Sequence, residues 1–130
     1  MPTWSRSLLL FAGVNLALAA MLSAYGFHGL SQHVTPEKMR SWEWAVQMHF
    51  YNCLGLIAIA FLLRLAPSSW LLKGAGALIV AGVVLFCGSI YAQLLGAPPA
   101  ISNVAPMGGT SFMLAWLLTG IAGWRLRATR

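Results

Sequence analysis

Two polar residues inside an apolar run, His49 and Asn52, are the strongest candidates for chemistry in this chain. They are three residues apart, so they share one face of a helix. If that helix crosses a membrane, its polar groups are expected to face the interior of a bundle. The pair could hold a ligand or handle a proton. It could instead form hydrogen bonds between helices, to Tyr91, Ser89 or a backbone carbonyl, and we favour this structural interpretation.

Metal binding and nucleophilic catalysis have little support in the sequence. His28 and His49 could act as metal ligands, but no His-Glu-x-x-His or Cys-x-x-Cys-His motif is present. Cys53 and Cys87 lie apart in apolar runs, where small buried cysteines are common. A nucleophile at Cys87 or Ser89 with His49 as its base would lack an orienting acid, because no carboxylate falls within an apolar run. We therefore expect no metal, no cofactor and no enzymatic activity.

The composition predicts that these residues lie in an integral membrane protein. Hydrophobic residues make up 59% of the 130 residues and charged residues 8%, whereas a soluble domain carries about 25% charged residues. The net charge of +6 comes from basic residues at the ends of apolar runs and not from a dense basic patch. We therefore expect no nucleic-acid partner. The predicted fold class is all-α, with residues 1–130 forming one membrane domain.

Four apolar stretches are long enough to cross a bilayer, whose core of about 30 Å requires roughly 20 residues. They are residues 7–27, 44–63, 74–95 and 105–124, and they must be helical because the bilayer offers no partner to the backbone. Thr35-Pro36-Glu37 has the composition of a helix N-terminus, and that helix could continue into the second span. Ser102 or Asn103 could cap the helix that leads into the fourth.

Basic residues predict the orientation in the cell inner (cytoplasmic) membrane. Four spans place both termini and the loop between spans two and three on one side, and that side carries six basic residues. The other side carries Lys38 and Arg40, so the positive-inside rule predicts cytoplasmic termini. Trp42 and Trp44 would then mark the outer interface. The six residues are Arg6, Arg64, Lys73, Arg125, Arg127 and Arg130.

In this topology the polar residues collect in the outer half of the bundle. We expect a polar cluster there, tied together by a glycine turn at the start of the fourth span. Gly108 and Gly109 in that turn would allow close helix approach or expose N–H groups to an anion. The candidate cluster consists of His28, His49, Asn52, Ser89, Tyr91, Gly108 and Gly109.

Small residues at helical spacing predict the faces on which the helices touch, because small side chains let membrane helices approach closely. The sequence contains one such stripe in the first span and another in the third. We therefore expect Ala17→Leu or Gly88→Leu to destabilise the bundle more than Leu62→Ala does. The stripes are Gly13, Ala17, Ala20 and Ala24, and Gly74, Ala77, Ala81 and Gly88.

Four segments in order resemble the domain of unknown function 423 (DUF423) family, which comprises small four-helix membrane proteins. Tyr25–Leu30 resembles its Gly-Ala-His stretch, and Met48–Asn52 resembles its Tyr-Gln/His-x-x-His pattern with Asn52 in place of histidine. Leu85–Tyr91 resembles Leu-Phe-Ser-Gly-Ser-Leu-Tyr with Cys87 for serine, and Ala105–Phe112 resembles Pro-x-Gly-Gly-x-Ser-Phe. The resemblance implies a fold and a membrane location, but no activity.

Two functions are therefore expected from the sequence. The first is a structural, accessory or assembly subunit that binds other membrane helices, in a larger membrane complex or a homo-oligomer, surrounded by membrane lipids. The second is a binding or transport module with an outer-leaflet pocket for a lipid, quinone or small solute.

The orientation generates the first testable prediction. Topology reporters fused after Arg130 and inserted in the 96–105 loop should report opposite sides of the membrane, with the C-terminal reporter in the cytoplasm. Two reporters on the same side would contradict the four-span topology.

Overall fold

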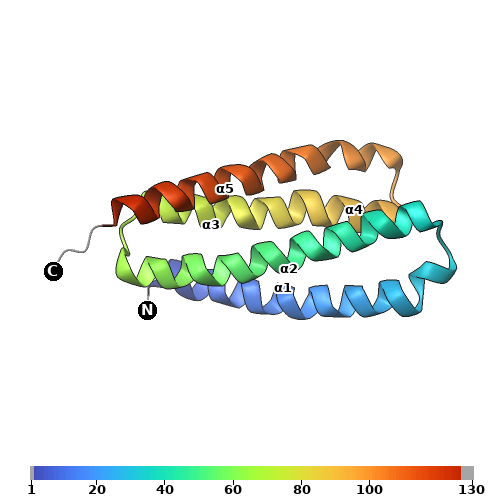
Figure 1. Cartoon of the computed structure of the whole chain (residues 1–130), viewed down its shortest axis with the longest axis horizontal. Helices are drawn as coiled ribbons and strands as arrows, with labels where there is room; N and C mark the ends of the chain where they lie inside the picture. The colour runs from blue at the N-terminus through green and yellow to red at the C-terminus, as the bar shows by residue number, and fades with distance from the viewer. Residues whose placement is uncertain (1, 127–130) are drawn as a thin grey trace.

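The computed structural model describes residues 2–126 and contains four long helical rods packed side by side, with both termini at the same end (Figure 1). The first rod is α1 (Thr3–His28) and the second is α2 (Pro36–Leu65). The third combines α3 (Trp70–Gly82), a π-helical turn (Val83–Cys87) and α4 (Gly88–Leu94). The fourth is α5 (Ala105–Arg125), preceded by a 3-10 helix over Pro99–Val104. Residues 2–126 include no strand, so the all-α four-helix prediction is confirmed.

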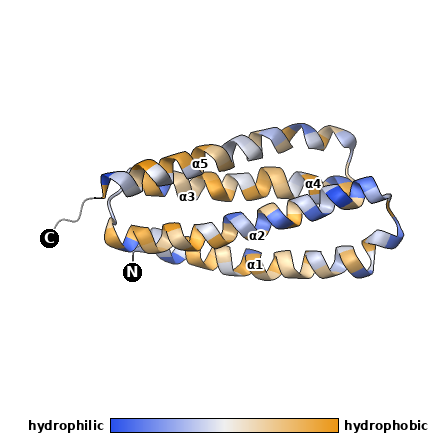
Figure 2. Cartoon of the chain, in the orientation of Figure 1, coloured by the Kyte–Doolittle hydropathy of each residue, from blue (hydrophilic) through white to orange (hydrophobic). Residues whose placement is uncertain are grey.

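Each rod is long and apolar enough to cross a membrane, with 25 to 30 residues per rod. Apolar side chains also cover the outside of the bundle, as expected for a surface that meets lipid. Hydrophilic residues gather at the end of α2 opposite the termini, which we call the far end (Figure 2). The rods extend a few residues beyond the predicted spans because their ends project past the hydrocarbon core.

The predicted helix start at Pro36 is confirmed, whereas the predicted side-chain cap of the fourth helix is wrong. The Thr35 hydroxyl accepts the Lys38 N–H at 3.3 Å, with Pro36 in the first helical turn. Neither Ser102 nor Asn103 caps α5, which follows Val104 without a side-chain cap. Ser102 instead donates to the Pro99 carbonyl at 2.8 Å, because the chain before α5 is already wound as a 3-10 helix.

The first small-residue stripe lies on the opposite face from its predicted contacts. Gly13, Ala17, Ala20 and Ala24 are exposed. The small residues of α1 that are buried recur every seven residues on another face, and they are Ser5, Ala12, Ala19 and Gly26. Both faces carry small residues at similar spacing, so spacing alone could not identify the packed face. The expectation that Ala17 lies in a helix contact is therefore wrong.

Large side chains fill the places where glycines leave room between the rods. The Trp116 ring lies against Gly55 and the Phe112 ring against Gly82, where an added Cβ would overlap each ring. In the predicted stripe of the third rod, Gly74 and Gly88 have only ordinary neighbours near 3.8 and 3.9 Å. The tight contacts of that rod are therefore one or two helical positions away from the predicted ones.

Gly108 brings α5 against the backbone of the π-helical turn. A Cβ on Gly108 would lie 2.9 Å from Phe86 Cα and 2.7 Å from Phe86 Cβ. A Cβ on the adjacent Gly109 would lie 3.9 Å from the Phe86 ring, which is ordinary contact. The π-helical turn, in which the helix carries an extra residue, thus packs directly on the glycine turn that the sequence singled out.

These two adjacent glycines provide a matched pair for a stability test. We expect Gly108→Ala to lower the free energy of unfolding by about 1–3 kcal/mol, because the Phe86 backbone cannot move aside. Gly109→Ala should be neutral or slightly stabilising, because alanine favours helix more than glycine does. Denaturant titrations in detergent measure both, and equal effects would contradict the close approach.

Candidate functional site

His49 is buried in the middle of the bundle and connects three rods. On α2 it is only 1% exposed, so both ring nitrogens need protein partners. Nδ1 lies 3.0 Å from the Tyr91 hydroxyl on α4. Nε2 lies 2.9 Å from Oδ1 of Asn15 on α1. The histidine therefore holds the first and third rods to the second.

The amide of Asn15 determines the direction of these bonds. Its Nδ2 donates to the Phe11 carbonyl of its own helix at 3.0 Å, which leaves Oδ1 as an acceptor. His49 must then donate from Nε2, so Nδ1 accepts the proton of the Tyr91 hydroxyl. The result is a directed chain from Tyr91 through His49 to Asn15. It requires the neutral ring with its proton on Nε2.

Asn52 repeats the same arrangement toward the fourth rod. Its Nδ2 donates to the Met48 carbonyl one turn earlier at 2.9 Å. Its Oδ1 accepts the Trp116 indole N–H of α5 at 2.8 Å. Trp116, which stood apart from the interface tryptophans in the sequence, is therefore a partner of Asn52.

The structure separates other members of the predicted cluster. His28 is exposed at the end of α1, where its ring packs against Phe27 at 5.1 Å between centroids. The prediction that it converges with His49 is wrong, because His28 lies two residues, or about 200°, around the helix from the buried Gly26. Ser89 is buried but bonds locally, donating to the Phe86 carbonyl at 3.0 Å. Gly108 contacts Phe86, and Gly109 borders a pocket.

Sequence reasoning missed Asn15, and it placed Trp42 at the lipid interface. Asn15 is the only amide within the first apolar run, and its polarity within a membrane span could have placed it on the packed face. Trp42 is 1% exposed and packs on Gly26 inside the bundle. Its indole N–H donates to the Leu22 carbonyl at 2.9 Å, and the centroid of its ring lies 4.8 Å from the centroid of the Tyr91 ring.

The interior polar groups find their hydrogen-bond partners within the bundle, on other side chains or on backbone carbonyls. Within residues 2–126, every buried side-chain nitrogen and oxygen has a hydrogen-bond partner. Cys53 and Cys87 are buried thiols, and Cys87 donates to the Ala45 carbonyl at 3.3 Å. The same described part of the chain brings together no group of three metal-ligating side chains. Chemically, the arrangement provides hydrogen bonds between helices.

An apolar pocket of about 500 Å³ opens between α2 and α5. Aromatic side chains dominate its lining, and the two members of the predicted cluster that border it are Asn52 and Gly109. The Asn52 oxygen is already occupied by Trp116. The aromatic and apolar residues of the lining are Trp44, Met48, Tyr51, Phe86, Phe112, Met113 and Trp116.

A family model described as "Protein of unknown function (DUF423)" matches residues 22–109, which is more than half of the chain. The chain belongs to the DUF423 family. It is 32% identical to UPF0382 membrane protein YwdK of Bacillus subtilis, over 88% of this chain and 93% of YwdK. It is 28% identical to UPF0382 inner membrane protein YgdD of Escherichia coli K12, over 95% and 93% respectively. No solved structure matches.

The four segments that resemble the DUF423 family occupy the contacts described above. Gly26 makes room for Trp42, and Gly108 lies against the π-helical turn that the third segment forms. In the second segment His49 lies in the hydrogen-bonded chain. Asn52, which replaces a family histidine, bonds Trp116. This chain is a multi-pass membrane protein whose helices are joined by polar side chains.

A double-mutant cycle tests the hydrogen bond between Asn15 and His49. We expect Asn15→Leu and His49→Phe each to destabilise the protein, because each leaves a buried partner unpaired. The coupling between the two should be about 0.6–1.7 kcal/mol, between the average and the maximum measured for such bonds in a membrane protein. Unfolding titrations in detergent measure it. As the control, Asn15→Leu with Trp116→Phe should be additive, and additivity in the first pair as well would disprove the bond.

Proposed function

We propose that this protein is a structural, accessory or assembly subunit that binds other membrane helices laterally, and that it is not an enzyme. The observation that carries this proposal is the division between an interior whose polar side chains are hydrogen-bonded and an exterior covered by large apolar side chains. The buried side-chain nitrogens and oxygens of residues 2–126 all have hydrogen-bond partners within the bundle. The surface left for recognition is then the lateral surface that faces the membrane.

The first and fourth rods supply most of that lateral surface. In the 18-residue apolar segment of the first rod, and in that of the fourth, 17% of the residues are buried inside the bundle. In the corresponding segments of the second and third rods, 44% are buried. The exposed face of α1 includes Gly13, where an added Cβ would meet no other part of the bundle within 4 Å, together with Ala17, Ala20 and Ala24. A face of small residues allows a second helix to approach closely, which supports van der Waals packing between membrane helices.

The proposed orientation places both termini in the cytoplasm. Arg6 and Lys73 fall in the first turns of α1 and α3, and Arg64 and Arg125 in the last turns of α2 and α5, whereas Lys38 and Arg40 fall at the start of α2. The start of α2 lies at the far end of the bundle, and the other four helix ends lie at the opposite end (Figure 1). Arg127 and Arg130, which also entered the charge count, lie outside the described residues. The asymmetry supports an inner-membrane protein whose partners meet it within the bilayer.

A second candidate function is a binding or transport module, and the pocket between α2 and α5 favours it. Its volume of about 500 Å³ lies within the range of small-molecule sites, and such sites are mostly apolar with a few polar groups. A quinone ring, a lipid chain or a small apolar solute fits an aromatic lining of this kind. Retention of such a molecule after gentle purification would favour this function over the first.

Two neighbouring alanines of α1 test the accessory function. Ala17 is exposed and Ala19 is fully buried. We expect Ala17→Leu to preserve the melting temperature in detergent but to weaken a complex seen by native mass spectrometry, because it enlarges only the outward face. Ala19→Leu should instead lower the melting temperature, because it separates α1 from α2. A protein that is monomeric before and after Ala17→Leu in native membrane extracts would contradict the proposal.

A further inference from the structure

The pocket between α2 and α5 is built from rings that the bundle itself holds in place. The Trp116 ring lies against Gly55 and the Phe112 ring against Gly82. A further part of the wall is Phe86 of the π-helical turn, whose ring centroid lies 5.9 Å from that of Phe112. Contacts between rods fix these rings, so the pocket is formed before a ligand enters, as is usual for small-molecule sites. π-Helical turns are also frequent at functional sites.

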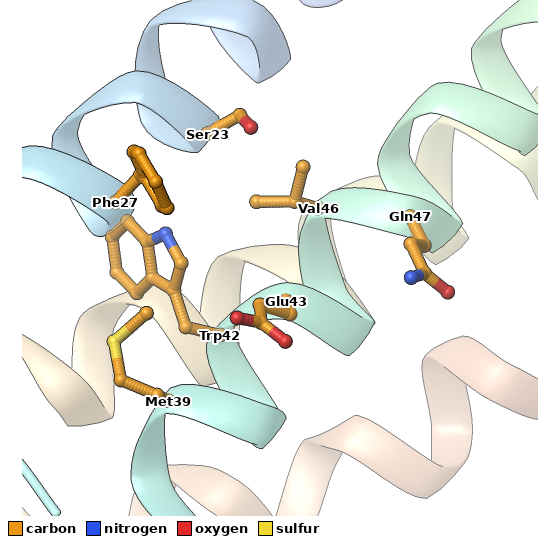
Figure 3. A pocket seen from close by; sticks show the side chains of 7 residues that line it. All are labelled: Ser23, Phe27, Met39, Trp42, Glu43, Val46 and Gln47. Atoms are coloured by element: carbon orange, nitrogen blue, oxygen red, sulfur yellow. The ribbon is translucent and has the colours of Figure 1, made fainter. Parts of the chain in front are cut away.

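The lining of this pocket favours a neutral ligand. A smaller hollow of about 290 Å³ between α1 and α2 includes Glu43 in its lining (Figure 3). The described residues that line the α2–α5 pocket, by contrast, include no charged side chain. A charged ligand there would have no counter-ion in apolar surroundings, which is costly.

The pocket opens toward the membrane. Its lining residues on α2 and α5 lie inside the two apolar spans, Pro36–Leu65 and Pro99–Arg125. Trp44, Tyr51 and Met113 of the lining are exposed on the outside of the bundle, where a membrane protein meets lipid. A ligand therefore reaches the pocket from the lipid phase, which restricts it to lipid-soluble molecules.

One buried polar side chain of the lining has a hydrogen left to donate. Asn52 is 3% exposed, and its amide nitrogen carries two hydrogens. Nδ2 donates one of them to the Met48 carbonyl at 2.9 Å, and Oδ1 accepts the Trp116 indole N–H at 2.8 Å. Within residues 2–126 the Met48 carbonyl is the one acceptor bonded to this nitrogen, so the second N–H is unpaired.

The unpaired N–H belongs to the wall of the pocket. Asn52 lines the pocket together with both of its partners, Met48 and Trp116. A buried N–H without an acceptor costs free energy. A ligand that brings an acceptor to this wall would remove that cost.

We propose that this pocket binds the ring of a lipid-soluble quinone, with one ring carbonyl accepting the second N–H of Asn52. The inference rests on the second candidate function, in which the pocket holds a small molecule. A quinone is neutral and planar, so its ring can pack against the aromatic walls, and such ring contacts are favourable beyond the area that they bury. Its apolar tail leaves through the opening toward the lipid.

The unpaired N–H selects a quinone over other molecules of the bilayer. An acyl chain would fill the apolar volume, but the chain itself has no acceptor. The ester carbonyls of a phospholipid are acceptors, but they lie near the membrane surface, whereas Asn52 lies near the midpoint of the 30-residue helix α2. An aromatic hydrocarbon would pack against the same rings and leave the N–H unpaired.

Methionine NMR of the full chain in detergent micelles tests the proposal, with ¹³C-labelled methyl groups. The probe is duroquinone, a fully methylated benzoquinone that has no free ring position for addition of a thiol. It should produce saturable shifts at Met48 and Met113, which line the pocket. Met21 and Met107 lie outside the pocket and are exposed on the bundle. They report quinone that only dissolves in the micelle, and their shifts should not saturate.

Durene is the matched control ligand, because it has the same methylated ring without the carbonyls. We expect it to bind about fivefold more weakly than duroquinone, as the loss of one hydrogen bond in a membrane predicts. Asn52→Leu should bring the two affinities together. Trp116→Phe breaks the same bond between side chains but keeps the Asn52 N–H, so it should preserve the ratio of the affinities.

Two glycines of α5 provide matched variants that do not alter Asn52. Gly109 borders the pocket, and a Cβ there makes only ordinary contact with Phe86. Gly109→Leu should therefore fill the pocket and weaken duroquinone binding by about tenfold. Gly120→Leu should leave the affinity unchanged, because Gly120 is exposed and an added Cβ meets nothing within 4 Å.

The outcomes separate the quinone from the pocket. Equal affinities of the native chain for duroquinone and durene would overturn the quinone proposal, while the second candidate function would stand. Shifts that do not saturate with either compound would overturn both. A preference for duroquinone that survives in a folded Asn52→Leu variant, or binding that Gly109→Leu leaves intact, would overturn the proposed site.

Discussion

The bundle depends on α2, because each side-chain hydrogen bond that joins two rods in the described chain has one partner on this helix. The core of a bilayer contains no water, so the hydrophobic effect does not drive helices together there. Van der Waals packing and hydrogen bonds of this kind decide which helices stay together. The bonds occur at successive levels along α2 and reach all three other rods. They are Ser5 with Ala60, Leu22 with Trp42, Asn15 and Tyr91 with His49, Cys87 with Ala45, and Trp116 with Asn52.

Close packing and hydrogen bonding support each other at these levels. Trp116 can present its indole N–H to Asn52 because Gly55, three residues further along α2, leaves room for the ring. Trp42 can reach the Leu22 carbonyl because Gly26 leaves room on α1. Each glycine therefore has a chemical role as well as a steric one. The interior of residues 2–126 accordingly contains no buried side-chain nitrogen or oxygen without a hydrogen-bond partner.

The fold could be predicted from the sequence more fully than the site. Local sequence features located the four rods and the start of α2, because helix formation and capping depend on neighbouring residues. These features are the apolar runs, the loop residues and the Thr35–Pro36 cap. The residues that meet between two rods depend on how each helix is rotated about its own axis. A small error in that rotation exchanges a packed face for an exposed one. His28 and Ala17 were misplaced for this reason. Tyr91 with His49 was correctly paired because few polar partners were available at that depth.

The central claim is that a closed set of hydrogen bonds on α2, centred on His49, joins the rods. Nitrogen NMR of the ¹⁵N-histidine-labelled protein in a lipid bilayer tests it most directly, with the His49 signals assigned by their loss in His49→Phe. The contacts of Tyr91 and Asn15 predict one neutral tautomer, with the proton on Nε2 and a bare Nδ1 that accepts a hydrogen bond. A proton on Nδ1, or an averaged ring that exchanges between tautomers, would contradict the directed chain and the role of α2 that rests on it.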